Sequence, residues 1–330
     1  MSRHYPIRLL GTGSYVPAGV RDNAYFTKYL DTSDEWIVSR TGIRERRVAA
    51  PDEAASDLGV HAARRALEDA GLSADDIDVL ICATATGDHQ FPATAAFIQN
   101  GIGAQSIPAF DVGAACAGFL YAAVVATGLL TSGLYRRALV IGTEALTRFG
   151  DDEDRGTVVL FGDAAGAAIF ERSDDEKQSV LYCYIGCDGS RADYIVAPAG
   201  GSRLPASQTT VAERMHFLRM RGREVYKFAV AKMLELIDEA LEQTGLSAED
   251  LALVIPHQSN LRIIESAREK LGLPREKMVV NIDRYGNSSA ASVIVGLDEA
   301  RKSGAVRSGD IVLMLGIGAG LTWGSMVLRL

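Results

Sequence analysis

Cys116 is the side chain best suited to act as a nucleophile. It lies in AFDVGAACAGFLYAA, where a strand is expected to end, small residues allow a tight turn, and a buried helix begins. The free N–H groups and the positive dipole at a helix N-terminus stabilise a thiolate, so this position predicts a lowered thiol pKa. Free cysteines are also commonly buried without any chemical role. An inert core residue therefore stays open as the alternative.

His257 and Asn287 are two polar residues that the sequence places beside turns. His257 follows the apolar run LALVIP, so it should lie just beyond the end of a buried strand, where open α/β sheets bind ligands. Asn287 follows Gly286, which permits a sharp turn before the small residues of a closely packed helix. Both also have a structural interpretation, since a lone histidine often serves packing and an asparagine before a helix often caps it.

An internal repeat connects these positions. The segment ALEDAGLSADDIDVLI from Ala66 closely resembles ALEQTGLSAEDLALVI from Ala240, which starts 174 residues further on (240 − 66). The same offset carries Cys116 to position 290, three residues beyond Asn287. The repeat therefore predicts two equivalent halves, with Cys116 and Asn287 in equivalent turns.

The arrangement of apolar runs predicts the fold class. Short Val/Ile/Leu runs alternate with helical segments, as is typical of buried strands covered by helices, and 330 residues exceed the usual size of a single core. We expect a layered α/β fold with an N-terminal half over 1–175, a C-terminal half over 176–330, and a site at their junction. The Gly/Ser/Pro-rich stretch 188–215 predicts a long surface loop with a functional role.

Composition and charge exclude several classes of protein. The 34 Lys and Arg against 42 Asp and Glu give a net charge of −8, which argues against nucleic acid as the main partner. A local basic segment, RMHFLRMRGREVYK from Arg214, fits either an anion-binding patch or a solvated helix face.

The four cysteines show no disulfide framework and the N-terminus shows no secretory signal, so a cytoplasmic location is expected. The uncharged stretch 112–135 is rich in glycine and alanine, which predicts a central buried helix and not a membrane span.

Two glycine clusters invite a dinucleotide-binding interpretation. The motifs GTGS from Gly11 and GIGAG from Gly316 both fail the required pattern, because position 16 is valine and a strand-like segment follows Gly320. A nicotinamide-dependent oxidoreductase is therefore a distant alternative. The second cluster is better suited to direct a backbone N–H group toward an oxyanion.

Trp36 and Arg40 are spaced to share one face of a short helix. They lie four residues apart in SDEWIVSRTG, between a capping serine and Gly42. An indole beside a guanidinium can hold an adenine and a phosphate. Simple packing of the indole with a solvated arginine is the alternative interpretation.

Over nearly its whole length the chain resembles β-ketoacyl-acyl-carrier-protein synthase III, a family of thiolase-fold condensing enzymes. The resemblance rests on motifs that occur in the family's order, including GTGSYVP, DTSDEWIVSRTGIRER, DVGAACAGF, DRGTVVLFGDAAGAA, PHQSNLRII, RYGNSSAAS and GAGLTWGS. It implies a five-layered α-β-α-β-α fold built from two duplicated halves.

The resemblance also implies a reaction. Cys116 would accept an acyl group, His257 and Asn287 would bind a malonyl thioester carbonyl, and the N–H groups of Cys116 and Ala319 would form the oxyanion hole. The implied reaction is the decarboxylative Claisen condensation of a short acyl-CoA, expected to be acetyl-CoA, with malonyl-acyl-carrier protein. It yields 3-oxoacyl-carrier protein, CO₂ and CoA and initiates fatty acid synthesis. Neither a metal nor a redox cofactor is expected, since the CoA thioester is itself a substrate.

Binding residues are implied in the same way. The resemblance assigns contacts with the CoA nucleotide to Trp36, Arg40 and Arg155, closure of the acyl pocket across a homodimer interface to Phe91, and docking of the acidic carrier protein to Arg262, Lys227 and Lys270.

The sequence departs from the family's pattern at several places. Ala319 and Ile317 stand where many relatives have Gly and Phe, and Arg223 replaces an amide side chain near the CoA channel. Glu269 replaces a basic residue of the docking helix, where Arg268 is expected to compensate. Relatives with the same Cys-His-Asn set transfer acyl groups to alcohols or amines or make secondary metabolites, so a carrier-protein requirement would discriminate. Acyl chain length and branching are left open.

Overall fold

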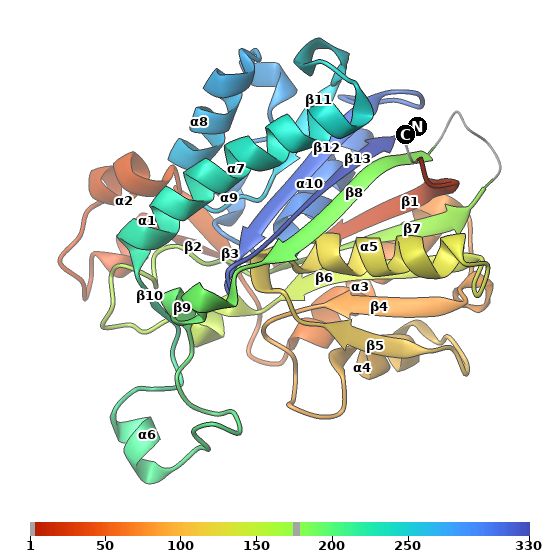
Figure 1. The fold of residues 1–330 in the computed structure, drawn as a ribbon. Helices are drawn as coiled ribbons and strands as arrows, with labels where there is room; N and C mark the ends of the chain where they lie inside the picture. Colours follow the sequence, from red (N-terminus) through yellow and green to blue (C-terminus); the bar gives the residue numbers. More distant parts are fainter. Residues whose placement is uncertain (1–3, 174–178) are drawn as a thin grey trace.

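The computed structural model describes residues 4–173 and 179–330, which form two main stacked sheets (Figure 1). The first sheet has the strand order β1 (Ile7–Tyr15), β7 (Ala164–Arg172), β6 (Arg137–Glu144), β4 (Val79–Ala83) and β5 (Ala109–Val112). The second has the order β11 (Leu253–Pro256), β12 (Ile311–Gly318), β13 (Thr322–Arg329) and β8 (Ser179–Cys187). Within these sheets, β4 runs parallel to β5 and β6, and β11 runs parallel to β12, whereas the other neighbours are antiparallel.

Helices complete five layers around these sheets (Figure 1). The outer face of the first sheet carries α3 (Ala55–Ala70) and α4 (Thr94–Ile102). The outer face of the second sheet carries α7 (Gly222–Thr244) and α8 (Leu261–Leu271). Between the two sheets lie α5 (Gly118–Thr131) and α10 (Ala291–Lys302). The shorter elements are α1 (Asn23–Phe26), α2 (Asp34–Thr41), α6 (Gln208–Ala212), α9 (Ile282–Tyr285), β2 (Gly19–Asp22), β3 (Glu45–Val48), β9 (Ile195–Val196) and β10 (Arg219–Met220). The predicted α-β-α-β-α fold is confirmed.

Several corresponding helix and strand boundaries in the two halves lie 174 residues apart, which is the offset of the internal repeat. Strands β6 and β12 begin at residues 137 and 311 and end at 144 and 318. Gly71 and Gly245 end α3 and α7 in the same left-handed conformation, with φ of 65° and 71°. The chain passes from the first sheet to the second between Arg172 and Ser179. The predicted boundary at 175/176 lies outside the described residues, so the division into two domains stays a prediction.

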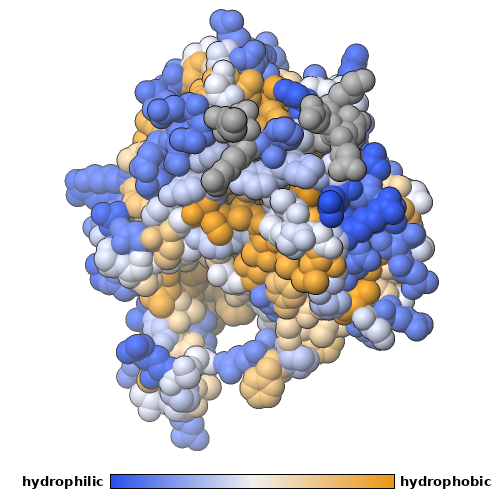
Figure 2. Space-filling view, turned by 45° about the vertical axis from the view of Figure 1, so that its right-hand side comes forward, coloured by the Kyte–Doolittle hydropathy of each residue, from blue (hydrophilic) through white to orange (hydrophobic). Residues whose placement is uncertain are grey.

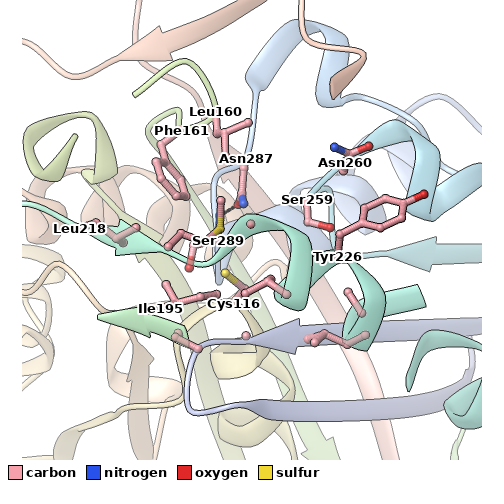
Figure 3. Close-up of a pocket in the computed structure, with 18 of the residues that line it drawn as sticks. Cys116, Leu160, Phe161, Ile195, Leu218, Tyr226, Ser259, Asn260, Asn287 and Ser289 are labelled. Atoms are coloured by element: carbon pink, nitrogen blue, oxygen red, sulfur yellow. Dashed lines mark hydrogen bonds between the residues drawn. The ribbon is translucent and has the colours of Figure 1, made fainter. Parts of the chain in front are cut away.

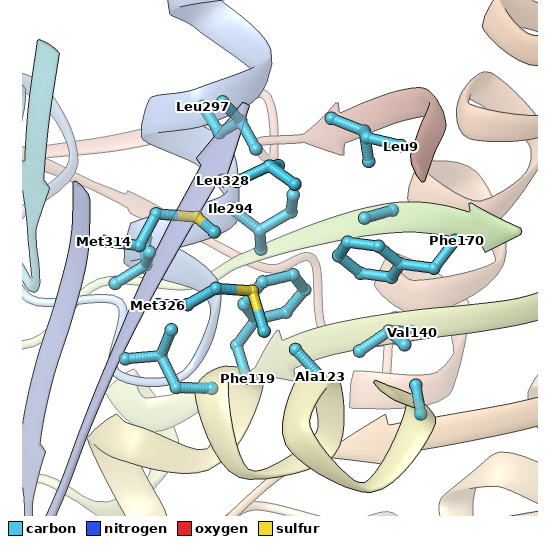
Figure 4. Packing of buried hydrophobic residues seen from close by; sticks show 14 of the residues in the cluster. Leu9, Phe119, Ala123, Val140, Phe170, Ile294, Leu297, Met314, Met326 and Leu328 are labelled. Carbon is cyan, nitrogen blue, oxygen red and sulfur yellow. The ribbon is translucent and has the colours of Figure 1, made fainter. Parts of the chain in front are cut away.

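The layer between the sheets is built from small and apolar side chains. Figure 4 shows that Phe119 and Ala123 of α5 face a buried apolar cluster. Ile294 of α10 and strand residues such as Met326 belong to the same cluster. A Cβ atom on Gly118 would lie 3.1 Å from the Cβ of Ala83, so a glycine there lets α5 begin close to β4. The predicted central buried helix is therefore confirmed, with its helical part at Gly118–Thr131. Within 4–173 and 179–330, no helix has the length and hydropathy needed to cross a bilayer.

The stretch 188–215 agrees with the predicted surface loop in most of its length. It contains only short regular elements, β9 and α6, and it carries α6 well away from the two sheets (Figure 1). Val211 of α6 is one of the apolar side chains that stay exposed.

Replacing Phe170 with alanine is expected to lower the free energy of unfolding by about 3–5 kcal/mol. The ring is buried in the core that both sheets share, so its removal costs transfer free energy and leaves a cavity. Urea titration followed by circular dichroism measures the change. The matched control is Val211→Ala, whose exposed side chain should change this free energy by less than about 0.5 kcal/mol. A Phe170→Ala variant as stable as the control would contradict the described core.

Candidate active site

One cavity of about 920 Å³ collects most of the residues that the sequence singled out. Its lining comes from both predicted halves of the chain, and many of the lining residues lie between 195 and 229. Cys116, Asn287 and Ser289 lie together at one end of this cavity, with Leu160 and Phe161 beside them (Figure 3). The predicted site residues that line it are Trp36, Arg40, Cys116, Arg155, Lys227, His257, Arg262, Asn287 and Ala319.

Cys116 lies in a short 3-10 turn, Ala115–Ala117, between β5 and α5. Ala115 adopts a left-handed conformation with φ of 45°, which makes the turn sharp enough to direct the thiol into the cavity. The surrounding protein desolvates the thiol and raises its pKa to about 12, and the nearby Glu144 carboxyl raises it further, while a hydrogen bond with Ser289 acts in the opposite direction. The predicted lowering of this pKa is therefore wrong, because desolvation outweighs the helix terminus. Cys116 is therefore a thiol at physiological pH.

His257 follows β11 directly, and its backbone N–H donates to the carbonyl of Leu315 at 2.7 Å. The ring is buried, and its Nδ1 lies 2.6 Å from Oγ of Ser292. Its Nε2 has no hydrogen-bond partner among the described residues although His257 lines the cavity. Burial lowers the pKa of the imidazole to about 3, so the ring is neutral at physiological pH.

Asn287 is held by backbone and side-chain hydrogen bonds. Its N–H donates to the carbonyl of Leu160 at 2.8 Å, and its carbonyl accepts from the N–H of Gly162 at 3.0 Å. The side-chain Oδ1 accepts from the N–H of Ser289 at 2.8 Å. Since Oδ1 is occupied within the turn, the Nδ2 group is the part of the amide that remains for a ligand. Figure 3 shows this side chain directed toward Cys116 and Ser289.

The turns that carry Cys116 and Asn287 are equivalent, as the repeat predicts. Ala115 and Ser289, 174 residues apart, have nearly identical positive φ angles of 45° and 46°. Ala115 lies three residues before the start of α5, and Ser289 lies two residues before the start of α10. The repeat thus places a thiol from one half and an amide from the other at one end of the cavity.

Ala319 lies in the turn between β12 and β13, against the turn of Cys116. A Cβ atom added to the preceding Gly318 would lie 2.7 Å from the backbone nitrogen of Cys116, so only a glycine allows this approach. The hydroxyl of Thr322 lies 2.8 Å from the carbonyl oxygen of Ala114 and 3.0 Å from that of Ala319. These contacts fix the two turns side by side, which suits the expected pairing of the N–H groups of Cys116 and Ala319.

Trp36, Arg40 and Arg155 form a cationic and aromatic group in the same cavity. Trp36 and Arg40 share one face of α2, as predicted; Ser33 caps this helix and Gly42 ends it with φ of 84°. The guanidinium carbons of Arg40 and Arg155 lie 5.9 Å and 5.1 Å from the centre of the indole. Such a group can stack a planar heterocycle and pair with phosphate.

The residues expected to dock a partner are more dispersed. Arg262 and Lys227 line the cavity, whereas Lys270 lies outside it and pairs with Asp238 at 3.5 Å. Arg268, which is expected to compensate for Glu269, pairs with Glu265 at 2.6 Å, and its role in docking stays a prediction.

The basic segment from Arg214 and the position of Phe91 both need comparison with what the sequence predicts. In the basic segment from Arg214, that residue pairs with Asp151 and Arg221 pairs with Asp193, so part of the predicted patch is neutralised. Phe91 does not line the cavity of its own chain, and its side chain is 84% exposed. A role of Phe91 in the acyl pocket therefore requires a second copy of the chain.

Glu144 is a buried residue that the sequence analysis missed. Its carboxylate accepts from the N–H of Ala85, the hydroxyl of Thr86 at 2.7 Å and the hydroxyl of Ser289 at 2.9 Å. Burial raises the pKa of this carboxyl to about 7. It ties together two parts of the cavity wall that come from different halves. The sequence feature that could have identified Glu144 is an acidic residue at the end of the apolar run ALVIGTE, where a buried strand ends.

Comparison with known proteins assigns the family. Two family models described as 3-oxoacyl-(acyl-carrier-protein) synthase III match residues 110–189 and, for the C-terminal part, residues 241–330. The β-ketoacyl-(acyl-carrier-protein) synthase III of Caldanaerobacter subterraneus is 49% identical over 321 residues, which is 97% of each chain.

Solved structures agree over the whole fold. The 3-oxoacyl-(acyl-carrier-protein) synthase III of Aquifex aeolicus has a TM-score of 0.90 at 44% identity, covering 98% of this chain and 100% of that one. The priming β-ketosynthase of the R1128 polyketide pathway has a TM-score of 0.90 at 37% identity, covering 100% of this chain and 98% of that one. The chain therefore belongs to the 3-oxoacyl-(acyl-carrier-protein) synthase III family of acyl-transferring condensing enzymes.

Proposed function

We propose that the enzyme condenses a short acyl-CoA, with acetyl-CoA as the expected substrate, with malonyl-acyl-carrier protein. The products are 3-oxoacyl-carrier protein, CO₂ and CoA, and the reaction is the first condensation of fatty acid synthesis. The observation that carries the proposal is that the Cys116 thiol, the unpartnered Nε2 of His257 and the amide of Asn287 share one cavity with a cationic, aromatic group.

The first half-reaction transfers the acyl group to Cys116. The sulfur attacks the thioester carbonyl, and the N–H groups of Cys116 and Ala319 stabilise the tetrahedral oxyanion. The bond from the carbonyl carbon to the CoA sulfur then breaks. Because the resting thiol has a pKa near 12, its proton has to leave during the attack, and the departing CoA thiolate is its final acceptor.

The second half-reaction forms the new carbon–carbon bond. After CoA leaves, the malonyl thioester loses CO₂, and the electron pair of the broken bond becomes an enolate. Donors on His257 and Asn287 stabilise the enolate oxygen, and neutrality of the imidazole keeps it from protonating the carbanion. The enolate carbon attacks the acyl thioester, the bond from the acyl carbon to the Cys116 sulfur breaks, and the departing thiolate takes a proton from solvent.

Substrate binding uses the rest of the cavity. Trp36, Arg40 and Arg155 bind the CoA nucleotide, and no metal or redox cofactor takes part in this chemistry. The enzyme acts in the cytoplasm. Arg262, Lys227 and Lys270 dock the acidic carrier protein, whose charge explains why an enzyme of net charge −8 keeps cations near its cavity.

A homodimer completes the acyl pocket. Strand β5 is an edge strand of the first sheet, and the exposed aromatic side chains include Phe91 and Phe97. Figure 2 shows a broad apolar area on one face of the molecule. An exposed strand edge beside apolar side chains is suited to pairing with a second copy, which would bring Phe91 to the partner's pocket.

The test of this function uses radiolabelled acetyl-CoA with malonyl-carrier protein. The proposal predicts covalent labelling of Cys116 and formation of 3-oxoacyl-carrier protein.

The likeness to a polyketide priming ketosynthase favours a secondary-metabolite condensing enzyme or a related acyltransferase as the second candidate function. Cys116 labelling followed by transfer to an alcohol or amine, without a carrier-protein requirement, would favour that candidate. Absence of labelling with any short acyl-CoA would refute both.

Arg262→Glu is expected to raise the KM for malonyl-carrier protein by about tenfold or more, with a smaller change in kcat. The substitution puts a negative charge where the acidic partner approaches. Steady-state kinetics at low and high salt measure it, because a docking effect should shrink as salt screens charge. Arg307→Glu changes the net charge equally at an exposed position outside the cavity, so it should leave this KM within about twofold. Equal effects in both variants would assign the change to net charge alone.

A further inference from the structure

Glu144, the last residue of β6, is a buried carboxylate that no cation neutralises. Its side chain is fully buried, and none of the arginines, lysines and histidines that the structure describes forms an ion pair with it. Neutral groups donate to it instead, namely the hydroxyls of Thr86 and Ser289 and the N–H groups of Ala85 and Ala290. Burying a carboxylate without a cation is costly, so its position beside the cavity suggests a chemical role.

Ser289 connects this carboxylate with the nucleophile. Its hydroxyl donates to Oε1 of Glu144 at 2.9 Å, and this bond uses the only proton of the hydroxyl. The same side chain is hydrogen-bonded to Cys116, so the thiol is the donor in that bond and Oγ of Ser289 is the acceptor. Figure 3 shows Ser289 and Cys116 together at one end of the cavity. A chain of hydrogen bonds therefore leads from the sulfur of Cys116 to the carboxylate of Glu144.

This chain of bonds leads from a proton donor to a suitable acceptor. In the free enzyme the proton stays on sulfur, because the thiol has a pKa of about 12 and the carboxyl one of about 7. When the sulfur shares its electron pair with a thioester carbonyl, the pKa of the S–H proton falls and transfer to the carboxylate becomes favourable. His257 also lines the cavity, but its imidazole, with a pKa of about 3, is a weaker base than Glu144.

We propose that Ser289 and Glu144 form a proton relay that takes up the thiol proton of Cys116 while the acyl group is transferred. The proton of the S–H group passes to Oγ of Ser289, and the hydroxyl proton of Ser289 passes to Oε1 of Glu144. The electron pair of the broken S–H bond stays on sulfur and forms the bond to the thioester carbonyl carbon. When the bond from that carbon to CoA breaks, the relay runs in reverse and the departing CoA sulfur receives the proton.

The two members of the relay have different roles. Ser289 touches the reacting sulfur, whereas Glu144 acts through Ser289 and is a positioning residue for the proton. The inference rests on the proposed function and deepens its first half-reaction, because it names the path of the proton between the two sulfur atoms. The relay has no role in forming the carbon–carbon bond, since the acylated sulfur carries no proton.

The rate of Cys116 labelling by acetyl-CoA, measured by rapid quench, tests the relay. Glu144→Gln keeps the shape of the side chain but accepts no proton, so it should lower the rate constant by about 100-fold or more. Ser289→Ala interrupts the same relay, so the double variant should be no slower than the slower single variant. Ser288→Ala removes a buried hydroxyl of the same turn that lies outside the relay, and it should be labelled at nearly the wild-type rate. Wild-type labelling of Glu144→Gln, or losses that multiply in the double variant, would overturn the proposal.

The pH dependence of labelling is a readout that a purely structural role would not change. Wild-type labelling should rise up to about pH 7 and then level off, because only the ionised form of Glu144 accepts the proton. The titratable neighbours Cys82 and Cys116 have raised pKa values and stay protonated, so this change belongs to Glu144. Labelling of Glu144→Gln should depend on free thiolate and rise about tenfold per pH unit from pH 7 to 9. The same pH profile in both proteins would contradict the relay.

Alkylation of the free enzyme need not level off in this way. An alkylating reagent reacts with whatever thiolate is present, and its leaving group needs no proton from Glu144.

A single-turnover measurement separates a broken relay from a collapsed turn. Each variant is first labelled to completion over a longer time, and malonyl-carrier protein is then added. Condensation should keep most of the wild-type rate, because it starts from the acylated sulfur. Parallel loss of labelling and condensation would assign Glu144 to the structure of the turn and overturn the proposal. Failure of the wild type to be labelled would instead refute the proposed function.

Discussion

Replacing Cys116 with alanine is expected to abolish both covalent labelling by acetyl-CoA and formation of the 3-oxoacyl product. No other described cysteine lines the cavity, so nothing can take over the acyl group there. The backbone of the turn, including the N–H group of residue 116, should be preserved. Labelling is measured by scintillation counting of precipitated protein and product by gel mobility of the carrier protein. Persistent labelling of the alanine variant would show that a different residue carries the acyl group.

The pKa near 12 adds a pH dependence to this first prediction. Since the thiolate is the reactive form, alkylation of Cys116 in the free enzyme should accelerate by about tenfold per pH unit from pH 7 to 9. A thiol with a lowered pKa would instead react at a constant rate across this range. Mass spectrometry of the peptide that contains Cys116 separates its reaction from that of the exposed Cys187. A plateau above pH 7 would contradict the dominance of desolvation.

Asn287→Asp is expected to lower condensation by about 10²- to 10³-fold, the cost of losing one oxyanion donor. The carboxylate has nearly the same shape, and it can still accept the N–H of Ser289 that Oδ1 accepts now, so the turn should be kept. It cannot donate, and it brings a negative charge to the developing enolate. Release of CO₂ from ¹⁴C-malonyl-carrier protein measures the step. Labelling of Cys116 should stay within about threefold of wild type, since acylation does not use this amide.

The pH dependence of the same variant provides its internal control. A protonated carboxyl regains a donor and loses its charge, so residual condensation should rise as the pH is lowered. The wild type supplies the baseline, because neither Asn287 nor the already neutral His257 changes protonation in that range, and any effect of Glu144, whose pKa is raised to about 7, appears in both proteins. A variant that loses labelling and condensation together would indicate a collapsed turn.

Much of the fold could be predicted because its signals are local or repeated. The caps of α2 at Ser33 and Gly42 follow from neighbouring residues alone. The equivalence of the turns at Cys116 and Asn287 follows from comparing two copies of one pattern, and the matching φ angles of Ala115 and Ser289 agree with it. The resemblance to a known family supplied the five layers and the roles of individual residues, which composition and periodicity did not.

The parts that could not be predicted depend on contacts between distant residues. The pKa of Cys116 depends on how completely other segments desolvate the thiol, and the helix start at Gly118 gave the opposite expectation. Glu144 joins Ser289 across 145 positions and Ser292 joins His257 across 35, and no local pattern indicates either pair. The basic segment from Arg214 could be found in the sequence, but the acids that neutralise Arg214 and Arg221, Asp151 and Asp193, come from other segments.

The two helices between the sheets set a lower limit on how far this protein can be shortened. One helix, α5, comes from the first copy of the repeat and the other, α10, from the second, and each sheet packs on both. A chain reduced to a single copy would expose an apolar sheet face and would hold only one of the two turns that the reaction needs. The two copies of the repeat are therefore not separable modules. Splitting the chain near residue 175 should yield fragments that regain activity only when they associate again.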